Sequence, residues 1–234
     1  MRPVLVGLVF AACLPLEAGL FDRVVIFGAS VSAEEKAPSP GRILAQQMGA
    51  RDHQVLVLAH GGAGSRRLAA FVDRIAAAQP TLIVAVDLFF HDFKFSLWLS
   101  EQDRRYLRDY IGRLQQTGAV LVLGNIPPQV FLRYRHVNRY LEQLEREFPR
   151  LVLIDLEAAV HQLEGGGLEV VHEGEPRVLF KRDVFADRVH PNLTGTTLLA
   201  NLILARLWER FPAEFPRNGA NCCPPRIPLP LAVR

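Results

Sequence analysis

The chain is poor in cysteine, with three in 234 residues, too few for the disulfide framework that holds many small secreted domains together. Cys222 and Cys223 are adjacent, and neighbouring cysteines make a poor disulfide pair because the backbone between them must strain. The sequence contains no C-x-x-C, no H-E-x-x-H and no histidine–cysteine cluster with ligand spacing. We therefore expect no disulfide framework, no metal site and no cofactor.

A basic stripe with interleaved aromatic residues is also absent, although the net charge is +3 and the pI is about 9.0. The basic residues are mixed with acidic ones, as in Glu101–Asp109. This mixture is typical of solvated helix faces. Nucleic acid is therefore not an expected partner.

No apolar run is long enough to span a bilayer, which takes about 20 residues. The run Pro3–Leu16 follows Met1-Arg2 and ends at Glu17-Ala18-Gly19, with a small residue at its end, as in secretory signals. Residues 1–19 therefore predict export to the periplasm or beyond the cell. The alternative is a buried N-terminal element in a cytoplasmic protein. Phe10 and the short leader argue against lipid anchoring at Cys13, although that segment is similar to a lipoprotein cleavage site.

Apolar runs alternate with amphipathic segments between residues 20 and 211, which indicates βαβ units in one domain. The predicted class is α/β, a three-layer, doubly wound (flavodoxin-like) domain with a five-stranded parallel sheet covered on both faces. The predicted strands are Arg23–Phe27, Gln54–Leu58, Thr81–Val86, Ala119–Leu123 and Leu151–Ile154. The predicted helices are Gly41–Gly49, Ser65–Ala78, Ser100–Thr117, Tyr134–Phe148 and Thr194–Phe211.

Two stretches interrupt this alternation. Leu168–Val171 and Arg177–Phe180 predict a surface hairpin that turns at Glu173–Pro176, after a run of three glycines. Residues 212–234 are rich in proline and without periodicity, so we expect an extended or disordered tail. On the helix over 134–148, Asn138 and Arg139 are expected at the surface.

Serine is scarce, with six in the chain, and no G-x-S-x-G occurs, which excludes the usual nucleophile elbow. Ser30 nevertheless follows the first predicted strand. Asp187 precedes His190 by three residues, just before the last helix, so a carboxylate can orient an imidazole there. Ser30, the glycine-rich loop 60–65 and His91 all follow strands whose carboxyl ends meet at one edge of a parallel sheet. These residues predict a site for acyl transfer.

Four segments between Val24 and Leu207 together resemble the SGNH/GDSL serine hydrolases. Gly28-Ala29-Ser30 is similar to the family's Gly-Asp-Ser block, with Ala29 in place of the Asp. The loop with Gly64 is similar to the second block, and His91 stands where the third, G-x-N-D, has its Asn. The last block, D-x-x-H-P before an apolar helix, is matched by Asp187, His190, Pro191, Asn192 and Gly195.

The resemblance implies a serine esterase that hydrolyses small or medium acyl esters, including lipid or carbohydrate esters, through an acyl-enzyme. Ser30 would be the nucleophile, His190 the base and Asp187 the acid. The N–H groups of Ser30 and Gly64, with the His91 side chain, would form the oxyanion hole, since histidine can donate in either charge state.

Two other functions are compatible with these residues. The departures at Ala29 and His91 would suit a non-catalytic relative that binds a ligand, and a shallow polar site would suit an O-deacetylase of cell-envelope carbohydrate. A deep slot would instead suit lipidic acyl chains. Three aromatic residues follow the third strand, namely Phe89, Phe90 and Trp98. They either pack in the core or contact the acyl group of the substrate.

Overall fold

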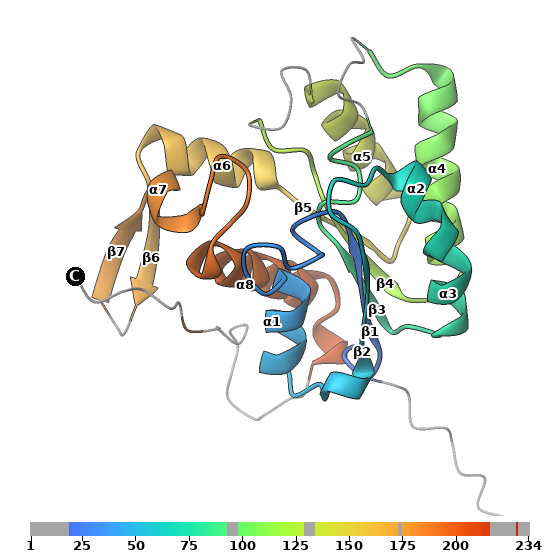
Figure 1. The fold of residues 1–234 in the computed structure, drawn as a ribbon, viewed down its shortest axis with the longest axis horizontal. Coiled ribbons are helices and arrows are strands. Elements are labelled where there is room, and N and C mark those ends of the chain that lie inside the picture. Colours follow the sequence, from blue (N-terminus) through green and yellow to red (C-terminus); the bar gives the residue numbers. More distant parts are fainter. Residues whose placement is uncertain (1–18, 93–97, 129–133, 173–174, 216–227, 229–234) are drawn as a thin grey trace, which may run out of the picture.

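The computed structural model describes residues 19–92, 98–128, 134–172, 175–215 and 228. Its centre is a five-stranded sheet with the order β2-β1-β3-β4-β5 (Figure 1), in which every neighbouring pair is parallel. The five predicted strands are confirmed, each to within one residue at either end. They are β1 (Val24–Gly28), β2 (Val55–Ala59), β3 (Leu82–Ala85), β4 (Val120–Gly124) and β5 (Leu151–Ile154).

Helices cover both faces of the sheet, which confirms the three-layer, doubly wound architecture (Figure 1). One face packs against α1 (Pro40–Gln47) and α8 (Leu193–Arg210) through a cluster that includes Leu44 and Leu204. The other face packs against α2 (Ser65–Leu68), α3 (Val72–Ala77), α4 (Glu101–Gln115) and α5 (Arg135–Glu147). All five strands lack polar alternation, and burial on both faces explains this for the four that are wholly buried, β1, β3, β4 and β5.

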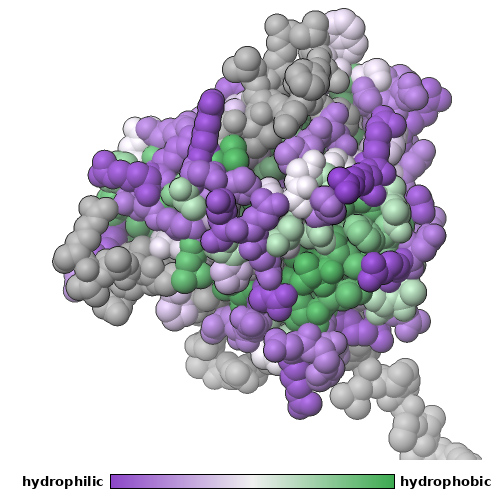
Figure 2. Space-filling view, in the orientation of Figure 1, coloured by the Kyte–Doolittle hydropathy of each residue, from purple (hydrophilic) through white to green (hydrophobic). Residues whose placement is uncertain are grey.

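The edge strand β2 is less covered than the others, and three of its residues, Val55–Val57, are half-buried. Figure 2 shows an apolar area at this position on an otherwise mostly hydrophilic face. Strand β2 lies at the edge of the sheet, with only β1 as a neighbour. Its sequence is nevertheless as apolar as that of the buried strands.

Helix α4 begins as its sequence predicts. The Ser100 hydroxyl accepts a hydrogen bond from the N–H of Asp103 at 3.1 Å, and the Asp103 carboxylate accepts one from the N–H of Ser100 at 3.1 Å. This reciprocal capping pairs two N–H groups that the helix itself leaves free. The helix ends just before Gly118, whose φ of +77° favours glycine. The predicted helix over 65–78, in contrast, is split into α2 and α3 by a 3-10 turn, η2 (Ala69–Phe71).

A small subdomain on the left of Figure 1 contains the predicted hairpin, β6 (Leu168–His172) and β7 (Glu175–Leu179), which is antiparallel. Two helices that the sequence analysis did not predict adjoin it, α6 (Leu156–Gly165) and α7 (Lys181–Val184). Leu163, Leu179 and Val184 join these elements in a cluster of their own. With four residues, α7 is too short to show a helical period.

The expectation that Asn138 lies at the surface is wrong, because its side chain is 1% exposed. Its Oδ1 accepts a hydrogen bond from the N–H of Ile126 at 2.8 Å, and its Nδ2 donates to the carbonyl of Ile126 at 3.0 Å and to Glu157 Oε2 at 2.9 Å. Asn138 thus holds the segment after β4 against α5 and α6. Its neighbour Arg139 is exposed, as expected.

The packed domain continues past its predicted end at residue 211. A 3-10 turn, η3 (Pro212–Glu214), leads to Phe215, which is 3% exposed and packs against Phe21 and Trp208 at ring-centroid distances of 5.9 and 5.1 Å. The predicted signal lies outside the described residues, as does most of the predicted tail. In the part of the chain that is described, no helix has the length and apolar character needed to span a bilayer.

We expect Asn138→Ala to lower the free energy of unfolding by about 2–4 kcal/mol, because it leaves both polar backbone groups of Ile126 unpaired in the core. Arg139→Ala is the matched control and should change it by less than about 0.5 kcal/mol. Urea denaturation of the two variants measures both values. Equal losses would contradict the anchoring role of Asn138.

Candidate active site

The turn that carries Ser30 is folded around one buried carboxylate, that of Asp87 just after β3. Asp87 accepts hydrogen bonds from the N–H groups of Ala29 at 3.1 Å, Val31 at 2.8 Å and Ser32 at 3.3 Å, and from the Ser32 hydroxyl at 2.6 Å. Burial raises the pKa of Asp87, and these hydrogen bonds oppose that effect. The carboxylate thereby fixes the backbone on both sides of Ser30 and points the serine out of the core.

Gly28 is required where β1 meets this turn. A Cβ atom at position 28 would overlap the Asp87 carboxylate and lie 2.6 Å from the Ser32 hydroxyl. No larger residue would let the carboxylate approach the turn so closely. The role of Asp87 was missed by the sequence analysis. An Asp at the end of a wholly apolar strand was the available signal, because a charge buried there needs several donors.

Ser30 and His190 are in contact although 160 positions separate them. The Ser30 Oγ lies 3.0 Å from His190 Nε2, and the Asp187 Oδ2 lies 2.8 Å from His190 Nδ1. The structure thus brings together the three residues that the sequence singled out, in the order hydroxyl, imidazole and carboxylate. The His190 side chain is 20% exposed, so a ligand can still reach it.

The loop that carries His190 is closed at both ends by backbone hydrogen bonds. The N–H of Ala186 donates to the carbonyl of His190 at 2.8 Å, and the N–H of Asn192 donates to the carbonyl of Val184 at 2.9 Å. Asn192 also caps α8, because its Oδ1 accepts from the N–H of Gly195 at 3.0 Å. A Cβ atom at Gly195 would overlap the Val184 carbonyl, so this close approach requires glycine. The imidazole therefore has a fixed support.

Asp187 is held in its ionised form. Its Oδ1 accepts from the N–H groups of His190 at 2.8 Å and Val189 at 2.9 Å. These two backbone hydrogen bonds, with the His190 side chain, lower the pKa of Asp187 to about 2. An ionised carboxylate at Nδ1 favours the tautomer whose Nε2 can accept a proton from Ser30.

The predicted oxyanion residues Gly64 and His91 are neighbours. Asp92 accepts a hydrogen bond from the N–H of Ser65 at 2.9 Å, and a Cβ atom at Gly64 would lie 2.7 Å from Asp92 Oδ1 and 3.9 Å from the backbone carbonyl carbon of His91. Burial raises the pKa of Asp92. The carboxylate of Asp92 therefore ties the loop after β3 to the turn before α2. The oxyanion role of the His91 side chain stays a prediction.

An apolar pocket lies beside the segments that carry Ser30 and His190. Val31, which follows Ser30, and Val189 and Pro191, which flank His190, form part of its wall. Its remaining lining comes from the ends of β3 to β5 and from α6, α7 and α8, and includes Phe90, Pro127, Leu156, Leu163, Phe185 and Leu199. The pocket thus lies next to the segments that carry Ser30 and His190.

The three aromatic residues that follow the third strand lie in different surroundings. Phe89 is buried in the core, where its ring meets Tyr110 at a centroid distance of 5.9 Å. Phe90 lines the apolar pocket, and Trp98 is 69% exposed. Their predicted contacts with substrate stay predictions.

Among the described residues, no group of three or more histidine, cysteine or acidic side chains is arranged to hold a metal ion.

Neither a family model nor a curated protein matches the sequence, but solved structures match the fold. A lipase/acylhydrolase from Enterococcus faecalis is 17% identical with a TM-score of 0.58, covering 80% of this chain and 96% of its own. TesA is 19% identical with a TM-score of 0.56, covering 82% and 99%. Axe2, an acetylxylan esterase from Geobacillus stearothermophilus, is 15% identical with a TM-score of 0.60, covering 88% and 100%.

The chain has the fold of the SGNH hydrolases. The match extends over nearly the whole length of each neighbour, so the resemblance predicted from four short segments is confirmed at the level of the fold. The hairpin β6–β7 and helix α7 stand between β5 and the His190 loop of this SGNH fold.

We expect the Asp187 carboxyl to titrate with a midpoint near 2, against 3.8 for an ordinary Asp. Because its pKa in the folded state is the lower one, Asp187 stabilises the fold above about pH 4, and this contribution is lost as the pH falls toward 2. Carboxyl ¹³C NMR, with Asp187→Asn to assign the signal, measures the midpoint. A midpoint near 3.8 would contradict the hydrogen-bonded arrangement around His190.

Proposed function

We propose that the protein is a serine esterase that hydrolyses small or medium acyl esters through an acyl-enzyme. The observation that carries the proposal is the contact of the Ser30 Oγ with His190 Nε2 at 3.0 Å, with Asp187 on the other ring nitrogen. A hydroxyl becomes a nucleophile when a base takes its proton, and a carboxylate behind the base stabilises the imidazolium that forms.

In the proposed reaction, His190 removes the Ser30 proton as the oxygen attacks the ester carbonyl. The imidazolium then gives this proton to the leaving alcohol, and an acyl group stays on Ser30. Water, deprotonated by His190, attacks the acyl-enzyme and releases the acid, and the proton returns to Ser30. Asp187 stays ionised throughout, consistent with its lowered pKa.

The developing oxyanion would be received by the N–H groups of Ser30 and Gly64. Neither N–H has an acceptor among the hydrogen bonds of the described residues, whereas Asp87 and Asp92 take up the N–H groups next to them. Two free donors beside a nucleophile are what an oxyanion requires. The His91 side chain is the proposed third donor, and one such donor is worth about 10²–10³ in turnover.

The apolar pocket supports an apolar acyl group as the part of the substrate next to Ser30. Its walls are almost entirely aliphatic and aromatic side chains, and apolar surface is stabilised when it leaves water. This favours an ester with an apolar acyl chain over the acetylated carbohydrate of an O-deacetylase, for which a shallow polar site is expected. The contact between Ser30 and His190 favours an enzyme over a non-catalytic binding protein. Export directed by residues 1–19 stays part of the proposal.

We expect Ser30→Ala to reduce the hydrolysis of p-nitrophenyl acetate and butyrate to the uncatalysed background, since the attacking oxygen is removed. Asp187→Asn keeps the size of the side chain but favours the wrong imidazole tautomer, so kcat should fall by about 10⁴-fold. Steady-state kinetics on the two esters measure both effects.

Ser100→Ala is the control, because Ser100 only caps α4 and its loss should leave kcat/KM within about twofold. Circular dichroism would establish that each variant is folded. Full activity in folded Ser30→Ala, or a folded wild type that hydrolyses no ester and reacts with no phosphonate, would overturn the proposed function.

A further inference from the structure

The two sides of the Ser30–His190 pair differ in chemistry. Ser30 follows β1, and on the β5 side of it lies the apolar pocket, whose walls come from the segments after β3, β4 and β5. On the opposite side of β1 lies β2, and the loop after β2 begins with His60 and Gly61. The carboxylate of Glu35 lies against this second loop, because a Cβ atom at Gly61 would overlap Glu35 Oε1.

The turn after β1, which carries Ser30, places Glu35 against the loop after β2. The chain after Ser30 coils back, so that the N–H of Ala33 donates to the carbonyl of Ala29 at 2.8 Å and the N–H of Glu35 to that of Ser30 at 3.4 Å. Glu34 then adopts a φ of +61°, a conformation that is strained for a residue with a side chain.

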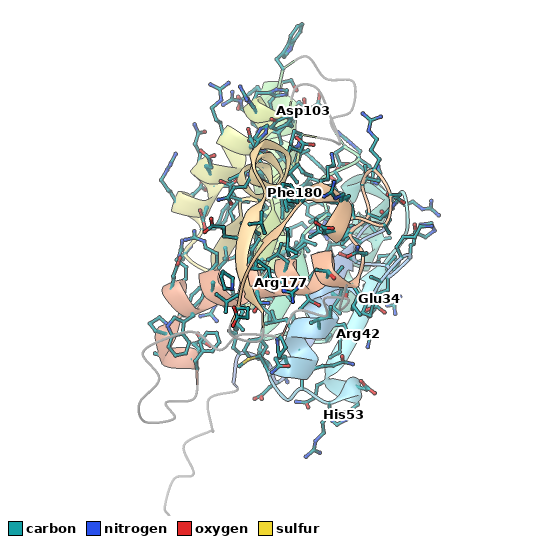
Figure 3. The ribbon with its side chains drawn as sticks, turned by 90° about the vertical axis from the view of Figure 1, so that its left-hand side faces the viewer. Glu34, Arg42, His53, Asp103, Arg177 and Phe180 are labelled. Atoms are coloured by element: carbon teal, nitrogen blue, oxygen red, sulfur yellow. The ribbon has the colours of Figure 1, made fainter. Side chains whose placement is uncertain are left out.

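Three hydrogen bonds compensate for this strain. The Glu34 Oε1 accepts from the N–H of Ser39 at 3.2 Å, from the Ser39 hydroxyl at 3.0 Å and from Arg42 Nε at 2.6 Å. Figure 3 shows Glu34 and Arg42 next to each other at α1. Backbone strain held by surrounding contacts is a common feature of functional sites. Here it fixes the position of the next residue, Glu35, beside the triad.

The Glu35 carboxylate points at the reacting groups, and the cation that it can pair with is a protonated His190. Its Oε2 lies 3.9 Å from His190 Nε2, and its side chain is 44% exposed. Among the described residues, no lysine or arginine lies within 4.0 Å of it. A carboxylate loses hydration when apolar surface covers it, which is costly. An acyl chain therefore belongs in the pocket on the β5 side, and the alcohol belongs on the side of Glu35.

We propose that Glu35 is a specificity-determining residue for the leaving group. Its carboxylate favours alcohols or thiols that carry a positive charge or hydrogen-bond donors near the ester, and it disfavours anionic ones. This inference rests on the proposed esterase function. It adds which end of the substrate lies on which side of Ser30, and which charge the departing end can carry.

Three thioesters with the same acetyl group and different leaving groups test the proposal. They are acetylthiocholine, which is cationic, its neutral isostere S-(3,3-dimethylbutyl) thioacetate, and S-acetyl-2-mercaptoethanesulfonate, which is anionic. Release of thiol gives kcat/KM for each. In Glu35→Gln, at low salt, the cationic-to-neutral ratio and the neutral-to-anionic ratio should each fall by about fivefold, the effect of one partly exposed charge.

Asp73→Asn is the matched control, since Asp73 lies on α3 with its side chain 95% exposed and its loss changes the net charge equally. Both ratios should stay at their wild-type values in this variant. Unchanged ratios in Glu35→Gln, or equal shifts in both variants, would overturn the assignment of Glu35.

Labelling of Ser30 by a fluorophosphonate separates this inference from the proposed function. A wild type that is neither labelled nor active on any ester would overturn both. A wild type that is labelled at Ser30 and hydrolyses p-nitrophenyl esters, but shows the same charge preference with and without Glu35, would overturn only the leaving-group assignment. Hydrolysis of p-nitrophenyl esters without turnover of any of the three thioesters would also overturn it.

Discussion

The site depends on the buried carboxylate of Asp87, which joins the end of β3 to the turn after β1. It accepts four hydrogen bonds from the three turn residues Ala29, Val31 and Ser32, which flank Ser30. An ionised carboxylate is an acceptor only, so four donors suit a charge that is excluded from water. The same contacts point Ser30 out of the core, leave its N–H without an acceptor among the described residues and place Val31 at the wall of the apolar pocket.

Sheet topology explains why groups so distant in sequence meet here. β1 lies between β2 and β3, so the turns that follow these three strands are neighbours, and they carry Ser30, Gly64 and His91. His190 lies in the loop just before α8, which is closed by a hydrogen bond between Val184 and Asn192. From this loop its side chain contacts Ser30. The site is therefore apolar toward β5 and has the Glu35 carboxylate toward β2, with the Ser30–His190 pair between these two sides.

The fold could be predicted from the sequence where the signal was local. The strands are continuous Val, Ile and Leu runs because both faces of the sheet are covered, and Ser100 with Asp103 marks a helix start. Features set by distant partners were missed or wrong. Asn138 is predicted at the surface from its helix alone, but it is buried because it pairs with the backbone of Ile126. Glu35 lies beside His190 after Glu34 with a positive φ, which no sequence pattern indicates. The four-residue helix α7 carries too little pattern to predict.

The central claim is that the Ser30 hydroxyl, activated by His190, attacks the substrate. Mapping the adduct of a fluorophosphonate by peptide mass spectrometry tests it most directly, because only an activated nucleophile next to an oxyanion hole reacts quickly with this reagent. We predict one adduct per chain, on Ser30 and on none of the other five serines, which disappears when the protein is unfolded first. An adduct on another residue, or none on the folded protein, would contradict this account.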